Sequence, residues 1–268
     1  MASPLALETP AWTDSFAGSP AIVWRGASRP HDGLPVVVFD GDDTLWSTEP
    51  LYDRARQAAR KIVDAAGLDA ETWWEYQLRV DVHNVEHFGL SAERFPTSSV
   101  DAYEKLAAEA GRPVDAAPRD SIWSASASVF EVIAPIHPQA HAVLQKLQPD
   151  HRLVLLTQGD PRVQVKRIED SGLGSLFDQI IIVAMKSSGV LGAIVDQFHI
   201  PHDNAWMVGN SIPSDINPAV AVGMRAIWVD AHVWSHERRE QLMTTAGHVN
   251  TAADLSQVPD IIRLNEHH

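Results

Sequence analysis

Three carboxylates follow directly on a short apolar run near residue 40. The run Val-Val-Val-Phe at 36–39 lacks polar alternation, which is typical of a strand buried on both faces of a parallel sheet. Asp40, Asp42 and Asp43 come immediately after it. Because like charges this close repel, the position calls for a compensating charge, and a hard divalent cation with oxygen ligands is the natural candidate. The carboxyl end of such a strand is also where open α/β sheets hold their ligands.

Further apolar strand segments, separated by helical patterns, follow in the second half of the chain. They lie at residues 153–157, 180–183, 206–208 and 226–229. Strands that alternate with helices predict a parallel, doubly wound sheet with helices on both faces. We therefore expect an α/β fold with a Rossmann-like core.

The stretch 50–135 has no strand signal and predicts an all-helical insert. Its first helix has one apolar face and is expected to stop at Gly67. A later helix is expected to begin with Ser98 or Ser99 as its N-cap. The insert separates the first strand from the rest of the sheet.

These patterns divide the chain into three parts. Residues 1–33 contain scattered prolines and predict a partly irregular arm with a short added strand at 21–24. The α/β core is expected at 34–49 and 136–268, and the helical domain at 50–135. We see no internal repeat or low-complexity segment.

Composition excludes several classes of function. The formal net charge of −14 and the absence of a basic run argue against nucleic acid and anionic membranes as partners. The chain has no cysteine, which excludes disulfides, thiolate catalysis and zinc–thiolate sites. No apolar stretch is long enough to span a bilayer, and no secretory signal pattern is seen, so we expect a cytoplasmic protein. The oligomeric state is left open.

Polar residues of the kind that phosphate chemistry uses follow four of the predicted strands. In chain order they are Asp40 and Asp42, then Thr157, Gln158 and Gly159, then Lys186, and finally Asn210 and Asp215. Because parallel strands end at the same edge of a sheet, we expect these groups to converge although they are far apart in sequence.

In this order, the four segments resemble the motifs of the haloacid dehalogenase (HAD) superfamily of hydrolases, with a helical, C1-type cap inserted after the first motif. The matching segments are VVVFDGDDTLW, LVLLTQGD, AMKSSG and MVGNSIPSDINPA, and the resemblance covers about residues 35 to 235. Each motif alone is weak evidence. All four in order, each after a predicted strand, form a specific signal.

The resemblance implies roles for the first two aspartates. Asp40 would attack phosphorus and form an aspartyl-phosphate intermediate. Asp42 would protonate the leaving alcohol and then take a proton from the hydrolytic water. Thr157 and Lys186 would hold phosphate oxygens, aided by the backbone N–H groups of the Gln158–Gly159 segment.

Magnesium is the cofactor that the resemblance implies. Its ligands would be the Asp40 carboxylate, the Asp42 carbonyl and the fourth motif, which contains Asn210 and Asp215. Asn210 stands where the family usually has aspartate, so one negative charge is lost, and Asp215 is expected to restore it directly or through a metal-bound water. Asp43 stands where the family often has glycine, and its charge is a second candidate for compensation.

The predicted function is a magnesium-dependent phosphohydrolase that removes phosphate from a small phosphorylated metabolite. One alternative is a carbon–halogen hydrolase without magnesium, although Asp42 would then be superfluous because a halide leaves without a proton. Another is a phosphate-ligand binding protein with little catalysis, suggested by Asn210 and the crowded carboxylates. A receiver domain is disfavoured, since it has no cap and carries its phosphoacceptor on a later strand.

Other residues carry weaker signals. His83 and His87 are four residues apart on a predicted helix, and His232 and His236 repeat that spacing, but ordinary histidines are favoured over a metal pair. Trp46 lies just past the first motif and is a candidate wall of the site.

Overall fold

The computed structural model describes residues 14–26, 33–230, 241–242 and 248–265. The chain divides into two compact units. One contains Met1–Ser47 and Ala134–His268, and the other is Thr48–Ile133. The second unit nearly coincides with the helical domain expected at 50–135.

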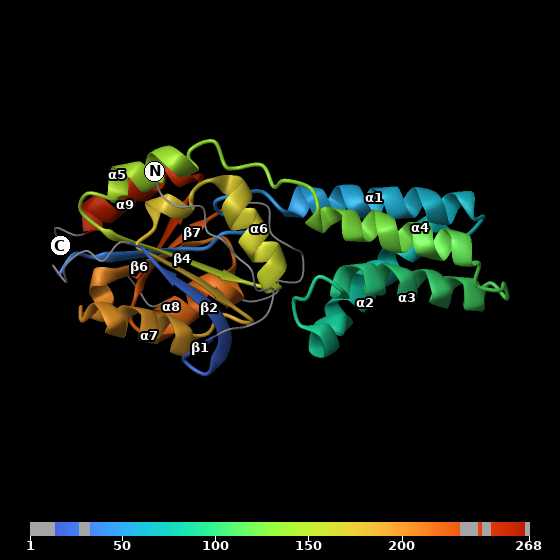
Figure 1. Cartoon of the computed structure of the whole chain (residues 1–268), viewed down its shortest axis with the longest axis horizontal. Coiled ribbons are helices and arrows are strands. Elements are labelled where there is room, and N and C mark those ends of the chain that lie inside the picture. The colour runs from blue at the N-terminus through green and yellow to red at the C-terminus, as the bar shows by residue number, and fades with distance from the viewer. Residues whose placement is uncertain (1–13, 27–32, 231–240, 243–247, 266–268) are drawn as a thin grey trace. The chain divides into compact units, whose positions relative to one another are not determined.

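The first unit is built on one mixed sheet (Figure 1). The order of its strands is β1-β2-β5-β4-β3-β6-β7-β8. Their bounds are β1 Asp14–Phe16, β2 Ser19–Arg25, β3 Val36–Phe39, β4 Arg152–Gln158, β5 Gln179–Val183, β6 Ala205–Gly209, β7 Arg225–Val229 and β8 Val249–Ala252. Strands β3 to β8 are parallel, and β1 and β2 are antiparallel. The predicted parallel α/β core is confirmed.

Helices cover both faces of this sheet (Figure 1). Helices α5 (Ala140–Leu147), α6 (Pro161–Ser171) and α9 (Val258–Asn265) lie on one face, and α7 (Ser188–Phe198) and α8 (Asn217–Ala221) lie on the other. All four residues of β3 are buried, as are all five of β5 and of β6. Burial on both faces explains why these strands read as continuous apolar runs.

Strand β3 lies at the point where the direction of winding reverses. From β3 the chain adds β4 and β5 on one side, then returns to add β6, β7 and β8 on the other. Loops leaving the carboxyl ends of strands on the two sides diverge at such a point, which leaves room for a ligand. The sheet therefore places the residues after β3, β4, β5 and β6 near one another.

The described part of the N-terminal arm, residues 14–26, is more regular than the sequence indicates. The expected short strand belongs to β2, which pairs antiparallel with β5 and is preceded by β1. Ala17 and Gly18 join the two strands with φ of 50° and 80°. Alanine rarely adopts such angles, so the sequence carries no hairpin signal here. The hairpin covers the edge that β5 would otherwise expose.

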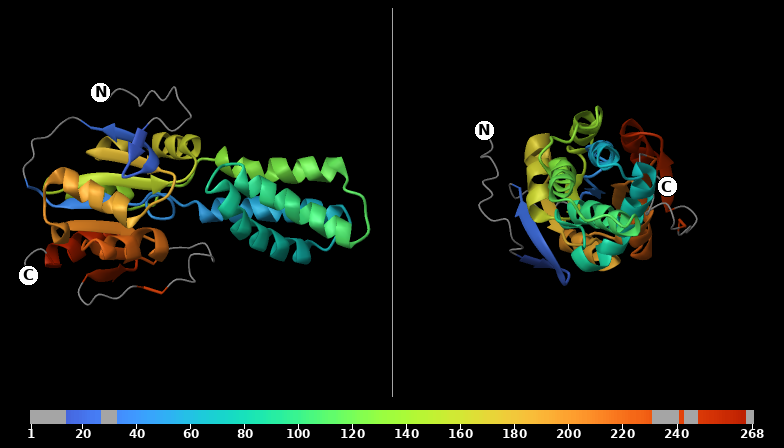
Figure 2. Two further views of the ribbon diagram at one scale, coloured as in Figure 1. Left: turned by 90° about the horizontal axis from the view of Figure 1, so that it is seen from below. Right: turned by 90° about the vertical axis from the view of Figure 1, so that its right-hand side faces the viewer.

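The second unit consists of α1 (Glu49–Ala65), α2 (Ala70–Phe88), α3 (Arg94–Glu109) and α4 (Ala116–Ala127), followed by a short 3₁₀ turn (Figure 2). A separate apolar core holds them together and includes Val63, Trp73, Tyr103 and Ile122. The Trp73 indole N–H also donates to the Ser99 carbonyl at 3.1 Å. None of the described helices, in either unit, has an apolar stretch long enough to cross a membrane.

One predicted helix boundary is wrong. Helix α3 begins at Arg94, so Ser98 and Ser99 lie inside it and are not N-caps. Their hydroxyls donate to the carbonyls of Arg94 (2.7 Å) and Phe95 (3.0 Å), which satisfies buried serines without ending the helix. Gly67 does follow the end of α1, with a φ of 72°.

Candidate active site

A buried lysine links two of the predicted site carboxylates. Asp40 follows β3, Lys186 follows β5, and Asp215 lies in a single π-helical turn, Ile212–Ile216, after β6. The Lys186 ammonium donates to Asp40 Oδ1 and, at 2.6 Å, to Asp215 Oδ1. All three side chains are buried, so the sheet brings these groups together in a water-poor environment.

Burial and charge act together on this cluster. Burial raises the pKa of Asp40 to about 8 against the attraction of Lys186, and the charges of Asp215 and Asp42 add to the rise. Burial acts to lower the pKa of Lys186, but Asp215 and Asp40 outweigh it and raise that pKa. The raised pKa of Lys186 favours its charged ammonium form. A metal cation bound next to Asp40 would add to this positive charge and would favour the carboxylate form of Asp40.

Asp215 is held by its own turn as well as by the lysine. Its Oδ2 accepts a hydrogen bond from the Ser211 N–H at 3.0 Å. Gly209, the last residue of β6, lies so close that a Cβ at this position would overlap the Asp215 carboxylate. This close approach gives a physical reason for glycine at the start of the fourth motif.

Thr44 connects Asp40 to Asn210. Its hydroxyl oxygen lies 3.0 Å from Asp40 Oδ2 and 3.3 Å from Asn210 Oδ1. The backbone carbonyl of Asn210 accepts a hydrogen bond from the Trp228 indole at 2.9 Å, which fixes the loop after β6. A carboxylate oxygen and an amide oxygen thus converge on one hydroxyl group.

These oxygen atoms are of the type that magnesium prefers. The described residues contain no group of three or more His, Asp or Glu side chains placed to hold a metal ion. The set fits magnesium only if the Asn210 amide oxygen serves with Asp40 and the backbone carbonyl of Asp42. Each oxygen of Asp215 accepts one hydrogen bond, from Lys186 or from Ser211, which leaves a second lone pair on each for a metal ion or a metal-bound water.

Asp42 receives hydrogen bonds from three side chains. The Trp46 indole N–H donates to Oδ1 at 2.6 Å, while Gln164 Nε2 and an Arg167 guanidinium nitrogen reach Oδ2 at 2.9 and 2.5 Å. Trp46, the predicted site wall, is buried, and its ring lies against Gly41, where a Cβ would come within 2.5 Å of a ring carbon. The first motif therefore folds around this tryptophan.

The turn after Asp42 explains the residue preference at position 43. Asp43 has a φ of 58°, in the left-handed region that glycine adopts most easily. Its N–H donates to the Trp46 carbonyl at 2.7 Å and closes the turn. Aspartate is among the few other residues that tolerate this conformation.

The second motif is placed at the site, but its donors are partly occupied. The Thr157 hydroxyl donates to Gln164 Oε1 at 3.0 Å. The Gly159 N–H donates to the Val183 carbonyl at 3.1 Å. This bond extends the β4–β5 pairing beyond the end of β4, so the N–H would have to leave the Val183 carbonyl before it could donate to a phosphate oxygen.

Gln158 acts through its side chain. Its Oε1 accepts a hydrogen bond from the Lys186 backbone N–H at 3.0 Å, and its Nε2 donates to the Ser214 hydroxyl at 3.1 Å. The residue thus ties the end of β4 to the loops after β5 and β6. It supports the loop that carries Lys186.

Trp46 was predicted as a wall of the site and not as a hydrogen-bond donor. Three other residues of this network were not predicted as site residues from the sequence: Thr44, Gln164 and Arg167. A signal for the last two does exist. They are three apart on the helix that follows the second motif, so they share one face, and both are buried. Polar residues on a buried helix face near a strand end indicate a partner within the site.

His83 and His87 do not form a metal site in the described part of the chain. The rings of His83 and His87 contact each other edge to face with centroids 5.4 Å apart, and they belong to no metal-binding group among the residues described. His232 and His236 lie outside the described residues.

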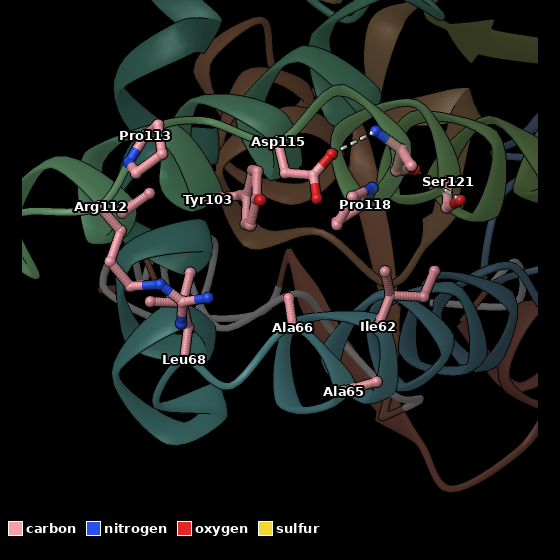
Figure 3. Close-up of a pocket in the computed structure, with 12 residues that line it drawn as sticks. Ile62, Ala65, Ala66, Leu68, Tyr103, Arg112, Pro113, Asp115, Pro118 and Ser121 are labelled. Carbon is pink, nitrogen blue, oxygen red and sulfur yellow. Dashed lines mark hydrogen bonds between the residues drawn. The ribbon is translucent and has the colours of Figure 1, made fainter.

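A separate cavity of about 500 Å³ lies within the helical unit (Figure 3). It is formed by the carboxyl end of α1, by α3 and by the start of α4, and its wall includes Ile62, Ala66, Tyr103, Arg112 and Asp115. The Asp115 carboxylate caps α4 by accepting from the Ala117 N–H at 3.1 Å. No predicted site residue lines this cavity.

The family model for haloacid dehalogenase-like hydrolases matches residues 34–223. The chain belongs to this family. The match includes all four motif segments and the whole helical unit, so this HAD-like hydrolase is an enzyme of the class that its motifs resemble.

Two curated relatives of the chain are named as a nucleotidase and a phosphatase. The pyrimidine 5′-nucleotidase YjjG of Escherichia coli strain K12 is 25% identical over 236 residues, covering 83% of this chain and 96% of the relative. A glyceraldehyde 3-phosphate phosphatase of Pyrococcus abyssi is 26% identical over 207 residues, covering 73% and 81%. The crystal structure of a HAD-like family hydrolase from Xanthomonas campestris superposes with a TM-score of 0.74 at 25% identity, covering 91% of this chain and 96% of that one.

Proposed function

We propose that this HAD-like hydrolase is a magnesium-dependent phosphohydrolase that removes phosphate from a small phosphorylated metabolite. The observation that carries the proposal is the buried contact of Lys186 with both Asp40 and Asp215, beside Thr44 and Asn210. This set combines a nucleophile, a fixed positive charge and oxygen ligands at one sheet edge. The two relatives described above support a phosphate ester as substrate.

The first step of the proposed reaction forms a covalent intermediate. A carboxylate oxygen of Asp40 attacks phosphorus, and the bond from phosphorus to the leaving oxygen breaks. The electron pair of that bond goes to the leaving oxygen, which takes a proton from Asp42. Lys186 stabilises the negative charge on the phosphoryl oxygens. The Thr157 hydroxyl and the Gly159 N–H would donate to the same anion after leaving their present acceptors, Gln164 and the Val183 carbonyl.

The second step returns the enzyme to its starting state. Asp42, now a carboxylate, takes a proton from water, and the water oxygen attacks phosphorus. The bond between phosphorus and the Asp40 oxygen breaks, which releases inorganic phosphate. Asp40, the Asp42 carbonyl and Asn210 would hold a magnesium ion, with Asp215 as a direct or water-mediated partner, and the ion would supply further positive charge at the phosphoryl group.

The helical unit has the proposed role of a cap that limits substrate size and excludes water. The acidic chain and the absence of a basic run favour a small-molecule partner over nucleic acid or a membrane. A cytoplasmic location is part of the same proposal.

The test is phosphate release from a panel of phosphorylated metabolites, with and without magnesium. We expect Asp40→Asn to lower turnover by about a thousandfold or more while leaving the circular dichroism spectrum unchanged, because the nucleophile is lost and the shape is kept. Asp203→Asn, an exposed carboxylate before β6, is the matched control and should retain full activity. Full activity of Asp40→Asn would reject the proposal.

Asn210 supports a second candidate function. Because an amide stands where the family usually has an aspartate, one charge that would bind a metal is missing. This favours a carbon–halogen hydrolase that attacks with the same Asp40 and uses no metal. Chloride release from 2-chloropropionate in the presence of EDTA, with no phosphate release from the panel, would favour this activity. Tight magnesium binding with neither product would favour a phosphate-ligand binding protein.

A further inference from the structure

Two buried side chains of α6 donate hydrogen bonds to Asp42. Building on the proposed phosphohydrolase activity, we propose that Arg167 and Gln164 are positioning residues that hold Asp42 by its Oδ2 and leave Oδ1 as the oxygen that exchanges protons with substrate and water. Both are supplied by the α/β unit, and neither belongs to the motif segments from which the site was predicted.

The distribution of hydrogen bonds distinguishes the two oxygens of Asp42. Oδ2 accepts from Gln164 at 2.9 Å and from Arg167 at 2.5 Å, whereas Oδ1 accepts from Trp46 at 2.6 Å. A carboxylate oxygen offers two lone pairs for hydrogen bonding. Among the described residues, the donors therefore fill Oδ2 and leave one lone pair on Oδ1.

The orientation of Gln164 is itself determined by its surroundings. Its Nε2 donates to Asp42 and, at 3.1 Å, to the Gln158 carbonyl, and neither of these partners is a donor. Its Oε1 accepts from the Thr157 hydroxyl at 3.0 Å. An amide flipped by 180° would place oxygen against two acceptors, so the side chain has one satisfactory orientation. Thr157 thereby acts on Asp42 through Gln164.

Stability alone is a weak reason for this arrangement. The Arg167 side chain is 7% exposed and the Asp42 side chain is 28% exposed, so a buried guanidinium pairs with a partly exposed carboxylate. Taking an arginine out of water costs about as much as such a pair returns. The arrangement does fix the carboxylate, because a guanidinium donates from a planar group of set geometry.

The consequence for the reaction depends on the leaving group. An alkoxide leaves poorly without a proton, so cleavage of an alkyl phosphate needs a well-placed acid. A nitrophenolate leaves readily without one. Loosening Asp42 should therefore slow leaving-group release from an alkyl phosphate far more than from an aryl phosphate.

The experiment measures the burst of leaving-group release by rapid quench, with glycerol 1-phosphate and 4-nitrophenyl phosphate as probes. We expect Arg167→Met to slow the burst with glycerol 1-phosphate by about 10- to 100-fold and with 4-nitrophenyl phosphate by less than about threefold, with KM little changed. Added guanidinium should restore part of the burst rate that Arg167→Met loses with glycerol 1-phosphate. The burst rate of Arg167→Lys should lie between those of the wild type and Arg167→Met. Arg162→Met, an exposed arginine of the same helix, should behave as wild type.

A double-mutant cycle tests whether Arg167 acts through Asp42. In an Asp42→Asn background, Arg167→Met should cause no further loss, because the group that it positions is already gone. Equal slowing of both probes, an undiminished effect in the Asp42→Asn background, or a failure of guanidinium to rescue a folded variant would overturn the positioning role. Absence of turnover by the wild-type protein on these probes and on the whole metabolite panel would instead reject the phosphohydrolase activity itself, and the positioning role with it.

Discussion

At the scale of single residues, Asn210 determines the charge of the inner site. Asp40, Asp215 and Lys186 together carry one net negative charge when both carboxyl groups are ionised, and Asp42 is paired with Arg167. An aspartate at position 210 would add a second negative charge beside Asp40. The amide therefore reduces both the attraction for a divalent cation and the repulsion among the carboxylates.

We predict that Asn210→Asp binds magnesium more tightly than wild type, by about tenfold or more, because a nearby full charge replaces an amide dipole. Isothermal titration of the EDTA-treated proteins measures the change. Asn204→Asp adds the same charge in the turn at the amino end of β6 and should leave the affinity unchanged. An unaltered or weaker affinity in Asn210→Asp would show that this side chain is not a metal ligand.

At the scale of secondary-structure elements, His202 joins two segments that pack on the sheet. One ring nitrogen lies 3.0 Å from Asp196 Oδ1 in α7, and the other lies 2.7 Å from the Val222 carbonyl after α8. The hydrogen bonds to Asp196 and Val222 raise the pKa of His202 against a smaller opposing effect of burial. A raised pKa means that the fold favours the protonated ring.

The stability that His202 contributes should therefore depend on pH. It is fully present below the pKa of the unfolded chain, about 6.5, and is lost as the pH rises through the higher pKa of the folded protein. We predict that His202→Gln lowers the free energy of unfolding at pH 5.5 more than at pH 9, as measured by urea denaturation. His141→Gln, an exposed histidine of α5, should show no such difference. Equal losses at both pH values would contradict the prediction.

At the scale of the whole molecule, the helical unit has the features of an independent domain. It has its own apolar core, in which Trp73 and Ile122 are fully buried. Arg94 and Asp81 form a buried ion pair between α3 and α2. These interactions all lie within Thr48–Ile133, so they do not depend on the sheet.

We predict that a fragment of residues 48–133 folds alone into a helical structure that unfolds cooperatively on heating. Circular dichroism in the far and near ultraviolet measures both properties. Trp73→Ala should destabilise the fragment by about 3–5 kcal/mol, because it empties the centre of the core and removes the hydrogen bond to Ser99. A disordered spectrum for the unaltered fragment would show that this unit needs the rest of the chain.

The amino-acid sequence by itself determined the order of the central elements, but not β1 or β8. Unbroken apolar runs identified β3, β4, β5, β6 and β7, since burial leaves a local record in composition. The same strand ends indicated Asp40, Lys186 and Asn210 as neighbours, because parallel strands finish at one edge. Periodicity likewise identified the helical unit. The expected N-cap at Ser98 is wrong, because the hydroxyl of this buried serine donates a hydrogen bond to a carbonyl of its own helix.

Tertiary structure alone decided which atoms meet. Arg167 reaches Asp42 across 125 positions of the chain, and no local pattern encodes that distance. Packing of α6 on the sheet also turned Gln164 toward Thr157, and continued pairing with β5 occupied the Gly159 N–H. The physical reason is that hydrogen bonds between distant residues depend on the order of the strands and on the angles at which helices pack on the sheet. The periodicity of burial, in contrast, depends only on each residue and its immediate neighbours.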